Sequence, residues 1–205
     1  MRKISIVLSC LWATSAYSAC VSPFIVNGND INVSVHPSFA SLFYDRINYD
    51  GRYGSGPYCG ATLLNSQYVL TAAHCIYGST QNQLFTSVVP QLQNETDFPN
   101  SVVQRVMVNE FYYPSSYNNS TLANDIAILK LASPITAVTS YATLGTTGDE
   151  GTYRQTSPVQ VFYAVGHGNT QTNIDASNKL QRTQLQYVPN ASCNGVYNVD
   201  TSANL

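Results

Sequence analysis

Two short stretches decide the fold: Leu70-Thr71-Ala72-Ala73-His74-Cys75 and Asn124-Asp125-Ile126-Ala127-Ile128-Leu129-Lys130-Leu131. The first follows a predicted strand at Tyr68–Thr71, and the second contains a predicted strand at Ile126–Leu131, because both segments are short and rich in β-branched and apolar residues. Each stretch therefore joins a strand to a titratable side chain at the strand's end. The first brings an imidazole and a thiol, and the second brings a carboxylate.

Working outward from these stretches, the chain continues as strand, turn, strand. Further strands are predicted at Phe39–Tyr44, Ala61–Leu64, Val102–Val108, Val159–Val165 and Leu180–Val188. Short strands at regular spacing with little helical periodicity predict an all-β sandwich or barrel. The segment 133–151 is rich in Thr, Ser, Gly and Ala, and it is predicted to connect two β units. The glycines of 50–57 predict a hairpin loop, because no Lys-Ser/Thr follows them as in a phosphate-binding loop.

The composition bounds the class of protein. A chain of 205 residues is long enough for one or two domains with real cores. Hydrophobic residues make up 44% and charged residues only 10%, which excludes a disordered polar chain. The net charge of −2 provides no basic surface, so nucleic acid is not an expected partner.

The N-terminus has the order of a signal peptide. Arg2 and Lys3 precede the apolar stretch 4–12, and Ala16 and Ser18 are the small residues of a cleavage site. We therefore expect cleavage after Ser18, a signal peptide at 1–18, and a secreted protein, either extracellular or periplasmic. A buried N-terminal helix and a lipoprotein acylated at Cys20 are the alternatives. No later stretch is long and apolar enough to cross a membrane.

Export implies an oxidising compartment, in which cysteines form disulfides. Cys20, Cys59, Cys75 and Cys193 remain after the signal peptide, and four cysteines allow three connectivities. A zinc site at Cys59, His74 and Cys75 would lack the usual ligand spacing, so no metal site is predicted.

Four local patterns occur in a fixed order, and together they resemble a known family. The patterns are Ile25-Val26-Asn27-Gly28, then Cys59-Gly60-Ala61-Thr62-Leu63-Leu64 closed by Leu70–Cys75, then Asn124–Leu131, and last Ala164-Val165-Gly166-His167-Gly168. In this order they resemble the chymotrypsin/trypsin-like serine proteases over essentially the whole mature chain. The resemblance implies an all-β fold of two antiparallel six-stranded Greek-key barrels with the active site in the cleft between them.

The resemblance also implies a division of the chain. Residues 19–24 would be a pro-segment, residues 25–132 the first barrel with the catalytic His and Asp, and residues 133–205 the connector and a partial second barrel. Ile25 would be the mature N-terminus, although Phe24 stands before it where relatives usually have Arg or Lys. The expected protein is a monomer that needs no cofactor and acts on protein or peptide substrates.

The resemblance assigns roles to particular residues. His74 would be the general base, and Asp125 would orient its imidazole and stabilise the imidazolium, as in the protease triad. Cys59 and Cys75 would form the disulfide across the loop that carries His74. His167 stands where the family usually has Trp, and it is interpreted as a structural substitution.

The nucleophile of such a protease is missing from the 205 residues. No Gly-Asp-Ser-Gly-Gly segment occurs, and Ser55 and Ser177 lack the sharp Gly-flanked turn of a nucleophile. We expect a truncated record whose second barrel is incomplete, whose Cys193 lacks its partner, and which is itself inactive. Two hypotheses remain, a secreted serine endopeptidase and a non-catalytic protease homologue that acts as a secreted binding protein. A small-molecule hydrolase is disfavoured, because Gly-x-Ser-x-Gly and alternating helices are absent.

Overall fold

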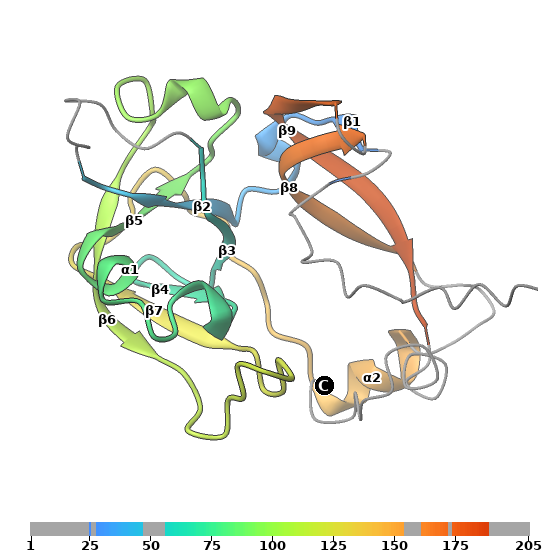
Figure 1. Cartoon of the computed structure of the whole chain (residues 1–205). Coiled ribbons are helices and arrows are strands. Elements are labelled where there is room, and N and C mark those ends of the chain that lie inside the picture. Colours follow the sequence, from blue (N-terminus) through green and yellow to red (C-terminus); the bar gives the residue numbers. More distant parts are fainter. Residues whose placement is uncertain (1–24, 26–27, 47–55, 154–160, 172–173, 189–205) are drawn as a thin grey trace, which may run out of the picture.

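The structure is a computed structural model, and it describes residue 25 and the ranges 28–46, 56–153, 161–171 and 174–188. Two β units lie side by side, with an extended segment and a short helix passing below them (Figure 1). The predicted signal peptide, pro-segment and C-terminal segment, with Cys20 and Cys193, fall outside the described residues.

The first unit is a closed six-stranded barrel. Its strands are β2 (Phe39–Tyr44), β3 (Cys59–Leu63), β4 (Tyr68–Thr71), β5 (Thr86–Pro90), β6 (Val106–Tyr112) and β7 (Ala127–Leu131). Around the barrel the order is β2-β3-β4-β7-β6-β5, and every neighbouring pair is antiparallel. Closure leaves no free sheet edge, so each strand's backbone groups have a partner on both sides.

The barrel core is built from alternating strand positions. In β7 the residues Ala127, Leu129 and Leu131 are buried, whereas Ile128 and Lys130 between them are partly exposed. The connector contributes Ile135 and Val138 to the same core, so it covers one end of the barrel. Each fully buried aliphatic side chain of this kind stabilises the fold by about 1.5–3 kcal/mol relative to an exposed one.

The second unit is a three-stranded antiparallel sheet with the order β1-β9-β8. Its strands are β1 (Asn29–Asp30), β8 (Val161–Gln171) and β9 (Ile174–Gln186). The short helical segments among the described residues are η1 (Val33–Val35), η2 (Ala73–Cys75), α1 (Thr80–Phe85), η3 (Glu95–Asp97) and α2 (Thr147–Tyr153). A closed barrel followed by a second sheet confirms the predicted fold class.

Most predicted strands are confirmed, and the differences have local causes. The strand predicted at Val102–Val108 begins only at Val106 and continues to Tyr112. Strand β5 was not predicted, because its sequence Thr86-Ser87-Val88-Val89-Pro90 does not alternate between polar and apolar residues and ends in a proline. The helix α2 occupies the end of the segment that composition assigned to a connector.

Gln93, which follows β5, links the two units through both its side chain and its backbone. Gln93 accepts a hydrogen bond from the Val33 backbone at 2.9 Å and donates to the Ile31 carbonyl at 3.0 Å. Its own carbonyl accepts the Leu180 backbone N–H of β9 at 2.9 Å. Both halves of the amide and the backbone of Gln93 are therefore engaged, which holds β9 and the N-terminal segment against the barrel.

Two histidines lie in the seam between the units and contact aromatic rings across it. His36, on the barrel side, lies 6.4 Å from the ring of Tyr163 in β8, and His167 of β8 lies 6.1 Å from the ring of Phe39 in β2. The Nε2 atoms of both histidines are buried without a hydrogen-bond partner. These contacts agree with a structural role for His167.

Candidate active site

His74 lies in the short turn that leaves strand β4. The Thr71 hydroxyl donates to the Gly60 carbonyl at 2.9 Å, which fixes the end of β4 against β3. The chain then enters the 3₁₀ turn η2, closed by a hydrogen bond from the Ile76 N–H to the Ala73 carbonyl at 3.0 Å. Ala73 is buried and anchors the turn in the core, whereas the side chain of the next residue, His74, remains half exposed.

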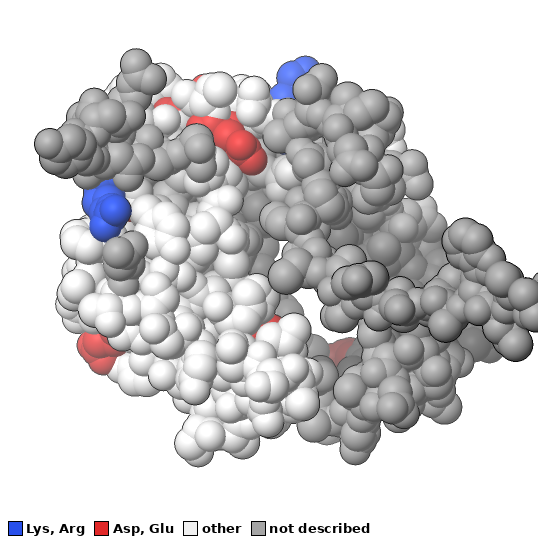
Figure 2. Space-filling model, viewed as in Figure 1, with Lys and Arg blue, Asp and Glu red and all other residues white. Residues whose placement is uncertain are grey.

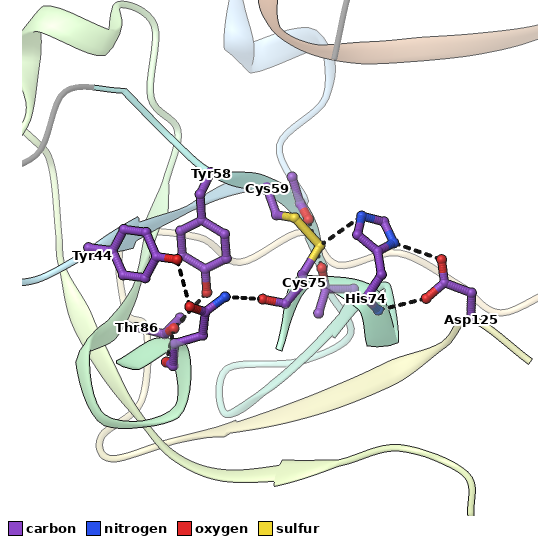
Figure 3. Close-up of a disulfide and its surroundings, with 10 residues drawn as sticks. Tyr44, Tyr58, Cys59, His74, Cys75, Thr86 and Asp125 are labelled. Carbon is purple, nitrogen blue, oxygen red and sulfur yellow. Dashed lines mark hydrogen bonds and ion pairs between the residues drawn. A yellow bond between two sulfur atoms is a disulfide. The ribbon is translucent and has the colours of Figure 1, made fainter. Parts of the chain in front are cut away.

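A disulfide and a buried amide secure the far side of this turn. Cys59 of β3 is bonded to Cys75, with 6.3 Å between their Cα atoms, so the predicted pairing of these two cysteines is present in the structure. The side-chain amide of Asn82 donates to the Cys75 carbonyl and accepts from the Tyr44 hydroxyl. The residue directly after His74 is therefore anchored through both its side chain and its backbone (Figure 3).

Asp125 is delivered by the start of strand β7. Strands β4 and β7 pair so that Thr71 lies opposite Ala127, which brings the residue two positions before Ala127 close to the His74 turn. Asn124 has a left-handed backbone with φ of 58°, a conformation that Asn tolerates better than most residues. Its carbonyl accepts the Ile126 N–H at 2.9 Å, so the chain turns sharply and presents the Asp125 carboxylate.

His74 and Asp125 meet through two hydrogen bonds. The backbone N–H of His74 donates to Asp125 Oδ1 at 2.8 Å, and the ring Nδ1 lies 2.7 Å from Oδ2 (Figure 3). An ionised carboxylate only accepts, so the short contact to Oδ2 requires the proton on Nδ1 and leaves the Nε2 lone pair available. This nitrogen faces the Cys75 sulfur at 3.6 Å. The pair has the tautomer that a general base needs.

A cleft of about 960 Å³ opens between the barrel and β8, with Asp125 in its wall. Leu122 and Ile126 flank the carboxylate, and both side chains are about half exposed. The other lining residues are His36, Ser38, Phe39, Gly60, Ala61, Thr62, Leu70, Thr71, Ala72, Asn124, Tyr163 and Val165. The wall therefore combines apolar side chains with hydroxyl, amide, imidazole and carboxylate groups.

Charged side chains are few around the cleft. On the face shown in Figure 2, neither the basic nor the acidic side chains gather into a large patch. This distribution agrees with the net charge of −2. Among the described residues that line the cleft, Asp125 is the one carboxylate, and none is Lys or Arg.

Among the described residues, Cys59, His74 and Cys75 bring potential metal ligands within 4.8 Å of one another. The two sulfurs are bonded to each other, so neither is a thiolate that could coordinate a metal ion. His74 is moreover engaged with Asp125. This cluster is consequently a disulfide beside an imidazole rather than a metal centre.

Comparison with known proteins places this geometry in a family. The family model for trypsin matches residues 25–205. The chain belongs to the trypsin family. Among curated members of the trypsin family, brachyurin from Leptuca pugilator is 27% identical over 183 residues, which are 88% of this chain and 72% of brachyurin. Chymotrypsin-like elastase family member 1 from Bos taurus is 32% identical over 172 residues, which are 82% of this chain and 59% of the elastase.

Solved structures give the same result for this trypsin-family chain. The Vibrio cholerae VesB protease has a TM-score of 0.66 and 26% sequence identity, covering 87% of this chain and 50% of that protein. This chain spans about half to three fifths of the length of most of these relatives. The fold is thus shared over nearly all of the residues compared, and it represents part of a typical family member.

The structure brings together the sequence-predicted residues His74, Asp125, Cys59 and Cys75. Ile25 lies apart from them, and its carbonyl accepts the Gly28 N–H at 2.9 Å. The residues that support the turn from behind, such as Asn82, could not be identified from the sequence. Asn82 belongs to helix α1, and its burial depends on how that helix packs against the rest of the fold. The sequence around Asn82 therefore does not indicate that the residue is buried.

Proposed function

We propose that this protein is a secreted serine endopeptidase in which His74 is the general base and Asp125 orients it. The observation that carries the proposal is the two-point contact of the Asp125 carboxylate with the ring and backbone of His74, within a trypsin-family fold. The reacting serine would come from a segment that these 205 residues do not contain.

In this mechanism the Nε2 of His74 takes the proton of the serine hydroxyl as its oxygen attacks the peptide carbonyl. The same nitrogen then returns the proton to the leaving amine, so no net proton is gained or lost. The Asp125 carboxylate accepts from Nδ1–H throughout, which keeps the tautomer and stabilises the imidazolium. No metal ion or cofactor takes part in these steps.

The proposed substrates are proteins or peptides that bind extended in the cleft beside Leu122 and Ile126. The proposed location outside the cytoplasm rests on the N-terminal pattern of 1–18 and on the Cys59–Cys75 disulfide, a bond that persists in oxidising compartments. Within the described residues, no helix has the length and hydrophobicity to cross a bilayer.

The proposal is tested in the protein that carries the serine segment, with a fluorophosphonate probe and broad peptide substrates. We expect one serine to be labelled stoichiometrically, His74→Ala to abolish turnover, and Asp125→Asn to lower kcat by about 10⁴, the magnitude known for the protease triad. A control outside the cleft is Asp149→Asn, whose carboxylate accepts from Thr146 at the start of helix α2, and it should leave turnover unchanged.

The 205-residue chain alone should not react with the probe, because no serine within it has a nucleophile's setting. Near-normal turnover in His74→Ala would show that the pair is wrongly assigned. Absence of any labelled serine in the longer protein, with peptide binding retained, would favour the non-catalytic binding protein instead.

A further inference from the structure

Three tyrosines from the two segments that carry His74 and Asp125 form a cluster. Tyr77 lies three residues after His74, and Tyr113 and Tyr117 lie in the connection between β6 and β7 that ends at Asp125. Their ring centroids are 5.7 Å (Tyr77–Tyr113), 5.0 Å (Tyr77–Tyr117) and 6.5 Å (Tyr113–Tyr117) apart, with interplanar angles of 69–77°. Edge-to-face packing at these distances is the favoured arrangement of aromatic pairs.

The cluster joins two segments that each supply one member of the pair. Tyr77 belongs to the His74 segment, since its backbone N–H donates to the Ala73 carbonyl at 2.9 Å. Tyr117 belongs to the Asp125 segment, and its side chain is 9% exposed within the barrel core. The ring of Tyr77 therefore rests on a residue that the core holds in place.

The Asp125 segment is a long irregular connection that closes on itself. The Asn118 N–H donates to the Ala123 carbonyl at 3.0 Å, and the Asn124 side-chain amide donates to the Ser116 carbonyl at 3.1 Å. These bonds fix the shape of the connection but not its distance from His74. Two contacts set the distance between the His74 segment and the Asp125 segment. On the N-terminal side of His74, Thr71 pairs with Ala127, and on its C-terminal side, the ring of Tyr77 packs on the ring of Tyr117.

The Asp125 carboxylate interacts electrostatically with Tyr117 of the cluster. Burial raises the pKa of Tyr117, and the negative charge of Asp125 adds to this effect. The Tyr117 hydroxyl donates to Asn119 Oδ1 at 2.9 Å, so the phenol is held by its own segment.

We propose that Tyr77 is a positioning residue, whose ring contacts with Tyr113 and Tyr117 hold the His74 imidazole at hydrogen-bonding distance from Asp125. This inference rests on the proposed function for its catalytic meaning, but the geometry that it predicts can be measured without turnover. The ring rather than the hydroxyl performs the role, because the described contacts of Tyr77 within the cluster are between rings.

The test is the imidazole Nδ1–H proton signal of His74 in the 205-residue chain, observed by NMR. A ring proton donated to a carboxylate resonates far downfield, and Asp125→Asn identifies the signal by removing it. We expect Tyr77→Ala and Tyr77→Leu to lose this signal and Tyr77→Phe to retain it. The leucine variant keeps apolar volume, so it protects the test against simple unfolding, which circular dichroism monitors.

The matched control is Tyr112→Ala, since Tyr112 is 48% exposed and Tyr77 is 45% exposed. Tyr112 interacts with Glu110 on the strand, and its removal should leave the signal unchanged. A folded Tyr77→Ala or Tyr77→Leu chain with an unshifted signal would overturn the proposal, and so would loss of the signal in Tyr77→Phe or Tyr112→Ala. In the longer protein, Tyr77→Ala should lower kcat with little change in KM. If that protein proves inactive, the proposed function fails while the NMR result still decides the positioning role.

Discussion

Replacing His167 with Phe should remove much of the acid sensitivity of this chain. His167 lies in the seam between the two units, where its Nε2 is buried without a hydrogen-bond partner and its Nδ1 lies 3.5 Å from the Ser41 hydroxyl. Burial lowers the pKa of His167 to about 4, and the nearby backbone of Leu92 and Gln93 offsets only part of this effect.

The magnitude follows from the difference between the folded and unfolded states. A histidine in an unfolded chain has a pKa near 6.5, so the pKa of His167 is about 2.5 units lower in the folded protein than in the unfolded one. Each pKa unit corresponds to about 1.4 kcal/mol of difference in proton-binding free energy between the two states. The unfolded state binds more protons between these two values, and stability therefore rises with pH in that window. His167 contributes nothing to the pH dependence above pH 6.5, and up to about 3 kcal/mol is lost as the pH falls from 6.5 to about 4.

The assay is urea unfolding, followed by circular dichroism, of the 205-residue chain and of His167→Phe at several pH values from 7 to 4. Phenylalanine keeps an aromatic ring against Phe39 but cannot take up a proton. The difference between the two free energies of unfolding removes the contribution of the carboxylates, which both proteins share. Two parallel curves across this range would refute the reasoning.

Three further outcomes are expected. Removal of the Cys59–Cys75 disulfide by double alanine substitution should lower the free energy of unfolding by roughly 3 kcal/mol, and peptide mapping without reductant should recover this pair rather than any other. Gly28→Ala should destabilise the chain by about 1–3 kcal/mol in thermal melts, because a Cβ there would lie 2.6 Å from Ile25 Cγ2 and 2.8 Å from the Ile25 carbonyl oxygen. Asn82→Ala should cost about 2–4 kcal/mol in the same assay, whereas Asn82→Asp should restore only the bonds accepted from the Tyr44 and Ser79 hydroxyls, since a carboxylate cannot donate to the Cys75 carbonyl.

The sequence was sufficient for the features that depend on short-range pattern. The run of mostly apolar and aromatic residues predicted the strand at Phe39–Tyr44 with its observed limits, and its first five residues are all buried. The stretches around His74 and Asp125 were recognisable for a related reason. The active-site fold needs a turn of small residues after one strand and a carboxylate before another. Each of these features occupies consecutive residues, so it can be recognised in the sequence.

The strand β5 and the supporting residues could not be read in this way. The sequence of Thr86–Pro90 has two polar residues, two valines and a proline without alternation, and the short helix before it has too few turns for a periodic signal. Asn82 gives no sign in the sequence that it bonds to the Cys75 carbonyl, since that partner is brought to it by the closed barrel.

By itself, then, the sequence determined an all-β chain and the residue types of the candidate pair. Only the tertiary structure decided that His74 Nδ1 and Asp125 Oδ2 lie 2.7 Å apart and that Tyr77 packs on Tyr117. The physical reason is that 51 residues separate His74 from Asp125 along the chain. Contacts over such a separation depend on how β4 pairs with β7, and that register is selected when the whole barrel closes around its core.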